Sequence, residues 1–448
     1  MRNDTLQWID IKLEDICQSI DYGYTASAVL EPVGPKFLRI TDIVNDYIDW
    51  ASVPYCEIDD KKLPKYQVMA GDIVIARTGA TTGYAKYIEE DFDAVFASYL
   101  VRIRMKPEID SRYIGFIVES EDYKRYIRAN FGGAAQPNAN ARVLTSYNLK
   151  LPPLEIQQKI SNILNLHNQL ISKNRRCIQI LEEMGKAIYR EWFVHFRLPG
   201  HEEVEMVDSE PGEIPEGWTA KKIKDAFDIL GGGTPSTKKE EYWTDGDINW
   251  YTPSDLTSSG TMFMNDSGRK ITELGLKKSS AKMFPPYSVM MTSRATLGVV
   301  SINTTPACTN QGFITCIPNE NISMYQIYFW IKDNVERIIS LGTGTTYKEI
   351  IKSVFREMDF IIPSVELKNK FEDVLSPMGK LILNLQNQNS VLSKTRNLLL
   401  PRLVSGEIDV STIDIGVNPD THKTSKYEDE QTTISQWLDG DEEYGGRK

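Results

Sequence analysis

The stretches LPPLEI at residues 151–156 and IPSVEL at residues 362–367 resemble each other and lie about 210 residues apart. Each is followed by apolar or neutral residues at alternating steps of four and three, the spacing of a coiled-coil seam. We therefore predict two long helices, within residues 151–198 and 363–410, that pair with each other. The predicted interface residues are Ile156, Ile160, Ile163, Leu170, Leu181 and Ile188 in the first helix, and Leu367, Phe371, Val374, Leu381, Leu385 and Leu392 in the second.

Each predicted helix follows its own globular stretch, so antiparallel pairing would return the chain on itself with pseudo-two-fold symmetry. His167 and Asn174 lie on the apolar stripe, where a buried polar residue is expected to fix the coiled-coil register. The alternative is that each helix packs separately on its own domain. Trp192, Phe193 and Phe196 either pack on the neighbouring domain, which we favour, or anchor a partner subunit.

The similarity between the two halves of the chain extends well before these helices. Four further pairs keep the same order: LEDI (13–16) with IKDA (223–226), GYTAS (23–27) with GTPST (233–237), LRITDI (38–43) with YTPSDL (251–256), and GDIVIAR (71–77) with YSVMMTSR (287–294). A period of this length is typical of a duplicated domain plus connector, because solenoid repeats are much shorter.

The interior of each repeat is predicted to mix strands and helices. Short β-rich runs occupy residues 74–76, 94–97 and 100–104, and helical spacing occupies 110–130 and 324–339. The predicted fold class is α+β, with two mixed α/β, β-rich domains separated by two long antiparallel coiled-coil helices. The predicted domain boundaries are 1–150 for the first domain, 199–215 for a linker, 216–362 for the second domain and 411–448 for an acidic, disordered tail.

Charge and cysteine content narrow the class of protein. The 448-residue chain has a formal net charge of −11, which argues against a DNA binder that acts alone, because Lys and Arg supply most phosphate affinity. The five cysteines are scattered without a CxxC pair, and no apolar run approaches a membrane span or a signal-peptide core. We expect a cytoplasmic protein with no membrane contact, no metal and no cofactor.

Three patterns suggest enzymatic chemistry, and each lacks an essential part. FPPY at 284–287 resembles the tetrapeptide of adenine methyltransferases, but Phe284 stands where an Asn or Asp oxygen must accept a hydrogen bond from the target amine. The glycines at 231–233 lack the Lys-Ser/Thr pair of a P-loop, so a turn is the favoured interpretation. The acidic residues at 439–443 lie in the predicted tail. A run of solvated charges is a simpler interpretation of them than a metal site.

Three motifs resemble the Type I restriction-modification specificity subunits. GGGTPS at 231–236, with YW at 242–243 and INW at 248–250, resembles the opening of a target recognition domain. LPPLEIQQKI at 151–160 resembles the start of the family's central conserved helix, and LLPRLVSGEI at 399–408 resembles its C-terminal conserved end. The resemblance spans about residues 5–410, and its specificity comes from the order and duplication of motifs that are individually modest.

This resemblance implies a non-catalytic subunit. Each globular repeat would read one half of a bipartite, asymmetric site in double-stranded DNA, and the two helices would set the spacer between the halves. Two methyltransferase subunits and ATP-driven restriction subunits would join the same complex. Two alternatives stay open: the chain methylates or cuts DNA itself, or it is an interaction scaffold that does not bind DNA.

Candidate DNA-contacting residues flank the predicted strand ends and Gly-rich loops at matching places in both repeats, because hydrogen-bonding side chains at exposed positions read bases. In the first repeat they are Arg77, Thr78, Thr81, Thr82, Lys86, Ser98, Tyr99, Gln136, Asn138, Asn140 and Arg142. In the second they are Ser293, Arg294, Thr296, Asn310, Gln311, Thr345, Thr346, Tyr347 and Lys348. For Arg77 and Arg294 the alternative is a structural ion pair.

Overall fold

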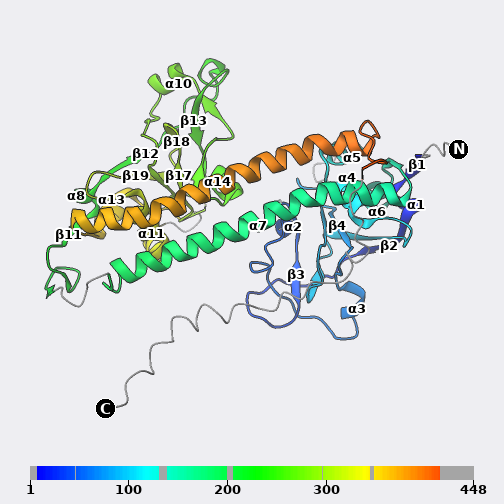
Figure 1. The fold of residues 1–448 in the computed structure, drawn as a ribbon, viewed down its shortest axis with the longest axis horizontal. Helices are drawn as coiled ribbons and strands as arrows, with labels where there is room; N and C mark the ends of the chain where they lie inside the picture. Colours follow the sequence, from blue (N-terminus) through cyan, green and yellow to red (C-terminus); the bar gives the residue numbers. More distant parts are fainter. Residues whose placement is uncertain are drawn as a thin grey trace, which may run out of the picture. The chain divides into compact units, whose positions relative to one another are not determined.

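The computed structural model describes residues 8–45, 47–130, 139–198, 205–294, 296–343 and 348–413, which fall into two compact units. Unit 1 comprises residues 1–166 and 396–448, and unit 2 comprises residues 167–395. Two 40-residue helices, α7 (Leu154–Phe193) and α14 (Val365–Val404), each contribute a segment to both units (Figure 1).

Unit 1 is built on a four-stranded antiparallel sheet with the order β2-β7-β4-β5. Two further pairs complete it: β3 with β6, which is parallel, and β1 with β8, which is antiparallel. The strands are β1 (Ile9–Lys12), β2 (Cys17–Tyr22), β3 (Lys36–Leu38), β4 (Ile73–Ala76), β5 (Ala85–Tyr87), β6 (Ala94–Phe96), β7 (Leu100–Met105) and β8 (Asn148–Leu151). The short helices are α1 (Leu13–Ile16), α2 (Ile40–Ile43), α3 (Leu63–Tyr66), α4 (Ser111–Glu119), α5 (Glu121–Asn130) and α6 (Ala141–Thr145).

Unit 2 repeats this plan with one extra strand, β14, in its main sheet, whose order is β12-β19-β16-β17-β14, and with β15 added to the parallel pair β13 and β18. Its strands are β9 (Met206–Val207), β10 (Ile214–Pro215), β11 (Thr219–Lys222), β12 (Asp228–Gly231), β13 (Ile248–Tyr251), β14 (Phe263–Met264), β15 (Lys270–Ile271), β16 (Val289–Thr292), β17 (Val300–Asn303), β18 (Ala307–Thr309), β19 (Phe313–Ile317) and β20 (Asp359–Ile362). Its helices are α8 (Ile223–Ala226), the 3-10 turn η2 (Glu240–Tyr242), α9 (Pro253–Ser259), α10 (Glu273–Lys277), α11 (Met324–Asp333), α12 (Val335–Ser340) and α13 (Lys352–Arg356).

The duplication extends to individual hydrogen bonds. The N–H of Leu13 donates to Tyr147 O at 2.9 Å, and the N–H of Ile223 donates to Met358 O at the same distance. At the starts of α2 and α9, the carboxylates of Asp42 and Asp255 each accept a hydrogen bond from the backbone N–H three residues earlier, which satisfies a donor that the helix leaves unpaired. The predicted repeat is therefore a repeated fold, with matching strands paired in the same direction.

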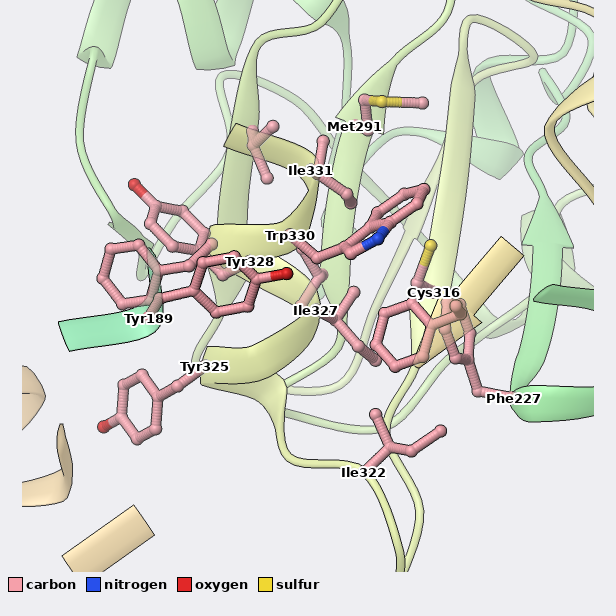
Figure 2. Packing of buried hydrophobic residues seen from close by; sticks show 14 of the residues in the cluster. Tyr189, Phe227, Met291, Cys316, Ile322, Tyr325, Ile327, Tyr328, Trp330 and Ile331 are labelled. Carbon is pink, nitrogen blue, oxygen red and sulfur yellow. The ribbon is translucent and has the colours of Figure 1, made fainter. Parts of the chain in front are cut away.

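Helix α11 lies in the hydrophobic core of unit 2. All seven residues from Tyr325 to Ile331 are buried, as expected for a helix that is apolar on every side. Figure 2 shows Tyr328 beside Tyr189 of α7, while Ile327 and Trp330 point toward Phe227 and Cys316. Glycine permits the close approach of α11 to the long helices, because a Cβ on Gly185 of α7 would lie 2.5 Å from the Phe329 ring.

Helices α7 and α14 run in opposite directions where they meet in unit 2. Asn174 donates a hydrogen bond to Asn389 Oδ1 at 2.9 Å, whereas Phe193 packs edge-on against Phe371 with ring centroids 4.9 Å apart. Trp192 also contacts Phe371, and Phe196 contacts Trp218, so these aromatic rings pack within the unit. In unit 1, α7 and α14 share one apolar cluster through their opposite ends.

Three of the twelve predicted seam residues are exposed. Ile156, Ile160, Leu367 and Phe371 are buried, and Ile163, Leu181, Ile188, Leu385 and Leu392 are half-buried. Leu170, Val374 and Leu381, however, are 49%, 41% and 47% exposed, and the next residues Ile171, Leu375 and Ile382 are buried instead. Both helices carry adjacent apolar residues at these points, so the spacing alone fits either choice.

The ends of the long helices also differ from the expected bounds. Residues 206–215, inside the predicted linker, contain the short antiparallel pair β9 and β10. Helix α14 ends at Val404, and Gly406 then adopts a left-handed φ of 77°, a conformation that commonly ends helices. The predicted helix over 110–130 is two helices, α4 and α5, separated at Ser120. Of the predicted tail, only residues 411–413 lie within the described ranges.

The corrected seam can be tested with two neighbouring residues. Ile382→Ala should lower the free energy of unfolding by about 2–5 kcal/mol, because a buried aliphatic side chain is lost and a cavity remains. Leu381→Ala removes a similar side chain from an exposed position and should change it by less than about 1 kcal/mol. Chemical denaturation of both variants measures the difference, and equal losses would refute the corrected register.

The close contact at Gly185 leads to a second prediction. Gly185→Ala should lower the free energy of unfolding by about 1–3 kcal/mol through overpacking against Phe329, although alanine favours helix formation. Adding Phe329→Leu should recover part of that loss, so the double variant should be more stable than the sum of the single effects predicts. Additive effects in a denaturation series would show that the two side chains do not compete for this space.

Candidate nucleic-acid interface

Three segments of unit 1 meet where strand β4 ends. Residues Ile73–Ala76 are all buried, and the chain becomes half-exposed at Arg77. The N–H of Arg77 donates to Tyr99 O at 3.0 Å, and the N–H of Ala139 donates to Arg77 O at 2.8 Å. These backbone bonds gather the polar side chains that follow β4, those of the β6–β7 turn and those at the start of α6.

Arg77 is held in place by a residue that the sequence did not single out. Its guanidinium lies over the ring of Tyr22, 4.9 Å from the centroid, and its Nε donates to Ala139 O at 3.4 Å. The Tyr22 hydroxyl accepts a hydrogen bond from the N–H of Ala141 at 3.0 Å. The only sign of Tyr22 in the sequence was its place as an aromatic residue directly before Gly23, at the end of β2.

The other first-repeat candidates differ in how free they are to bind a ligand. Tyr99 is 57% exposed, Arg142 is exposed, and Thr78, Thr81 and Ser98 are half-buried. Three candidates have structural partners: Thr82 is buried and donates to Gly79 O, Asn140 caps α6, and Lys86 forms an ion pair with Glu119 at 3.2 Å. Gln136 and Asn138 lie outside the described residues.

Unit 2 has the same backbone arrangement at the end of β16. The N–H of Ser293 donates to Gly312 O at 2.8 Å, and the N–H of Ile350 donates to Ser293 O at 3.0 Å. Ser293 therefore occupies the position of Arg77, and Arg294 occupies that of Thr78. The sequence match that paired Arg77 with Arg294 was wrong by one residue, because a seven-residue stretch was set against an eight-residue one.

The glycines at 231–233 align with unit 1 one residue away from the sequence match. A Cβ on Gly23 would collide with the carbonyl of Ala97, and a Cβ on Gly232 would collide with the equivalent carbonyl of Asn310. Gly23 therefore matches Gly232, whereas the sequence match paired it with Gly233. Three consecutive glycines hid this register, which only the close backbone approach distinguishes.

The second-repeat candidates also differ in exposure and in whether they have a structural partner. Arg294 is exposed and forms an ion pair with Glu349 at 2.7 Å, the structural alternative considered for it. Ser293 is buried, Gln311 accepts a hydrogen bond from Thr234 at 2.6 Å, and Asn310 accepts one from the N–H of Gly312. Thr296 and Lys348 are exposed, whereas Thr345, Thr346 and Tyr347 lie outside the described residues.

The most buried charge cluster in unit 1 is structural. Arg102 donates to Asp21 at 2.8 Å, and Arg104 donates to Asp72 at 2.7 Å. Burial raises the pKa of Asp21, but the hydrogen bonds from Arg102 and Ser19, together with the charges of Arg102 and Arg104, outweigh burial and hold the pKa below its ordinary value. The carboxylates are thus neutralised by arginine, so the cluster resembles a fixed ion-pair network more than a catalytic centre.

The described part of the chain bears on metal binding and on membrane insertion. Within it, no group of three or more His, Cys, Asp or Glu side chains could hold a metal ion. The described helices include none that is both long and apolar enough to cross a bilayer.

Known proteins match both halves of the chain. The model of the Type I restriction modification DNA specificity domain matches residues 6–183 and 215–393. The HindI specificity subunit of Haemophilus influenzae is 24% identical over 90% of this chain and 99% of its own length. The MjaIX specificity subunit of Methanocaldococcus jannaschii is 38% identical, over 43% of this chain and 45% of its own length.

A solved structure shares the fold. The Type I restriction-modification S subunit from M. genitalium aligns over 90% of this chain and 97% of its own, with a TM-score of 0.51 and 15% identity. Two matched α+β units that share paired helices define a protein made by duplication of one specificity domain. The chain belongs to the Type I restriction modification DNA specificity domain family, whose model covers both repeats.

Proposed function

We propose that this chain selects the DNA sequence on which a Type I restriction-modification complex acts. Each unit reads one half of a bipartite, asymmetric site in double-stranded DNA, and the chain performs no catalytic step. Two methyltransferase subunits and the restriction subunits bind to the same chain and carry out the chemistry.

The observation that carries this proposal is the use of different side chains at matched backbone positions. Thr78 in unit 1 corresponds to the exposed Arg294 in unit 2, and Ser98 corresponds to Gln311 by the hydrogen-bond register. Arginine pairs best with guanine and glutamine with adenine, whereas serine is less selective. One fold that presents two sets of donors is suited to a site whose halves differ in sequence.

Exposed apolar residues on the helices support the binding of two copies of one partner. Leu170 and Leu381 occupy the same position in α7 and α14, and each is about half exposed. The net charge of −11 supports the same conclusion, because partners must then supply many of the phosphate contacts. Duplicated apolar contact points suit two identical subunits.

An exchange of one domain tests the function directly. Residues 216–362 would be replaced by the matching segment of another family member, and the host genome would be sequenced for methylated adenine. We expect one half of the methylated motif to change and the other half to remain. A methylated motif that changes in neither half would contradict the proposal that each unit reads one half-site. Methyl transfer by the purified chain alone would favour the enzymatic alternative.

Arg294 provides a residue-level test. Arg294→Ala should weaken sequence-specific binding by the assembled complex by roughly 1–3 kcal/mol if Arg294 reads a guanine, as measured by titration with the target duplex and a mismatched competitor. Glu349→Gln removes the ion-pair partner and keeps the arginine, so it should leave specific binding unchanged or strengthen it. Equal weakening by both variants would assign Arg294 a structural role.

A further inference from the structure

Three cations of unit 2 gather at a place that the candidate interface does not include. Lys352 is the first residue of α13 and is half-buried, and Arg356 is the exposed last residue of the same helix. Lys282 precedes β16 in the chain and is exposed. Arg356 lies four residues after Lys352, on the same side of α13. Ser280, two residues before Lys282, lies against Gly233, two residues after the Gly231 that lies beside Lys352.

No ion pair to a carboxylate is found for these three cations among the described residues. Nearby Lys222 and Lys224, by contrast, pair with Asp359 and Glu357 at 2.6 and 2.9 Å. Burial lowers the pKa of Lys352, and the charges of Arg356 and Lys282 lower it further. Like charges held together in this way favour the binding of an anion, which would relieve their repulsion.

The Lys352 side chain lies beside a glycine. A Cβ on Gly231, at the end of β12, would lie 3.7 Å from the Lys352 ammonium nitrogen. In unit 1 the matching positions are Tyr22 and Ala141, whose hydroxyl and backbone N–H are joined by a hydrogen bond. Large and small residues have thus changed places, with tyrosine and alanine in one unit and glycine and lysine in the other.

The exchange preserves a positive charge at one point of the fold. In unit 1 that charge is Arg77, which comes from the end of β4 and lies over Tyr22. In unit 2 the residue matched to Arg77 is the buried Ser293, and Lys352 brings the charge from α13 to the matching end of β12. Two different routes to the same charge, in an acidic chain, indicate that the charge itself is required at this point.

We propose that Lys282, Lys352 and Arg356 form a phosphate-binding site for the DNA backbone in unit 2, equivalent to the contact made by Arg77 over Tyr22 in unit 1. The inference rests on the proposed function, because it assumes that unit 2 lies against DNA. Ammonium groups suit this role, since they act as point charges toward phosphate and do not by themselves distinguish bases.

The test measures how DNA affinity depends on salt. The full chain, in complex with its methyltransferase subunits, would be titrated with a random-sequence DNA duplex at several salt concentrations. Lys282→Gln, Lys352→Gln and Arg356→Gln are each expected to reduce the slope of log affinity against log salt by about 0.9, the loss of one phosphate contact. The matched control is Lys277→Gln, which removes the same charge from an exposed lysine paired with Glu273 at 3.0 Å and should leave the slope unchanged.

A second readout does not depend on affinity. Lys352 in the wild-type complex would be exposed to a lysine-acylating reagent, and its modification would be measured by mass spectrometry with and without the duplex. We expect the duplex to protect Lys352 and inorganic phosphate at the same phosphate concentration to protect it far less. Equal protection by inorganic phosphate would overturn the DNA contact in favour of a free-anion site.

The outcomes separate this inference from the proposed function. Slopes equal to that of Lys277→Gln, in a complex that still methylates its target sequence, would overturn the phosphate site alone. A wild-type complex without sequence-selective methylation would instead overturn the proposed function. Thermal unfolding of each variant identifies any slope change that follows from a folding defect, and Lys352 acylation in the wild-type complex still decides that case.

Discussion

The contact between α7 and α14 is the interaction on which both units depend. In unit 1, Ile156, Ile160 and Leu164 of α7 belong to the same buried cluster as Leu403 of α14. In unit 2, Tyr189 and Phe193 share a cluster with Leu367 and Phe371 in the same way. The apolar face of each long helix is stable only when it is buried, so each unit gains its helical layer only when segments about 200 residues apart in sequence meet.

The repeat and the long helices could be predicted because their signals are long and redundant. A stripe over 40 residues and four matched motifs leave little room for another architecture. The seam position could not be predicted, because pairs such as Leu170–Ile171 and Leu381–Ile382 offer an apolar residue to either register. The side of the helix that is buried depends on the curvature of the partner and on α11, neither of which is encoded locally.

The position of the candidate residues at strand ends could be predicted, but their contacts could not, for a different reason. A strand that ends in polar residues is visible in sequence, so Arg77 and Arg294 were found. Their partners are not visible: Tyr22 lies 55 residues before Arg77, and Glu349 lies 55 residues after Arg294. The state of an arginine, whether stacked on a ring or paired with a carboxylate, follows from tertiary contacts that no local pattern contains.

The two units tolerate this divergence because backbone hydrogen bonds position their variable side chains. The carbonyl of residue 77 or 293 accepts the same bond whichever side chain is present. Substitutions at the strand ends therefore change the exposed side chains without disturbing the sheet that holds them. Such a scaffold can change the side chains at the strand ends of one unit while the other unit keeps its own.

Unit 1 is assembled from both ends of the chain, since Leu403 and Val410 are buried in a cluster with Leu13 and Ile16. Unit 2 is continuous from residue 167 to residue 395. During synthesis, the second half of the chain can therefore complete its core before the first half does. The N-terminal half must wait with apolar surface open until residues beyond 400 leave the ribosome, which makes it the natural client of a chaperone.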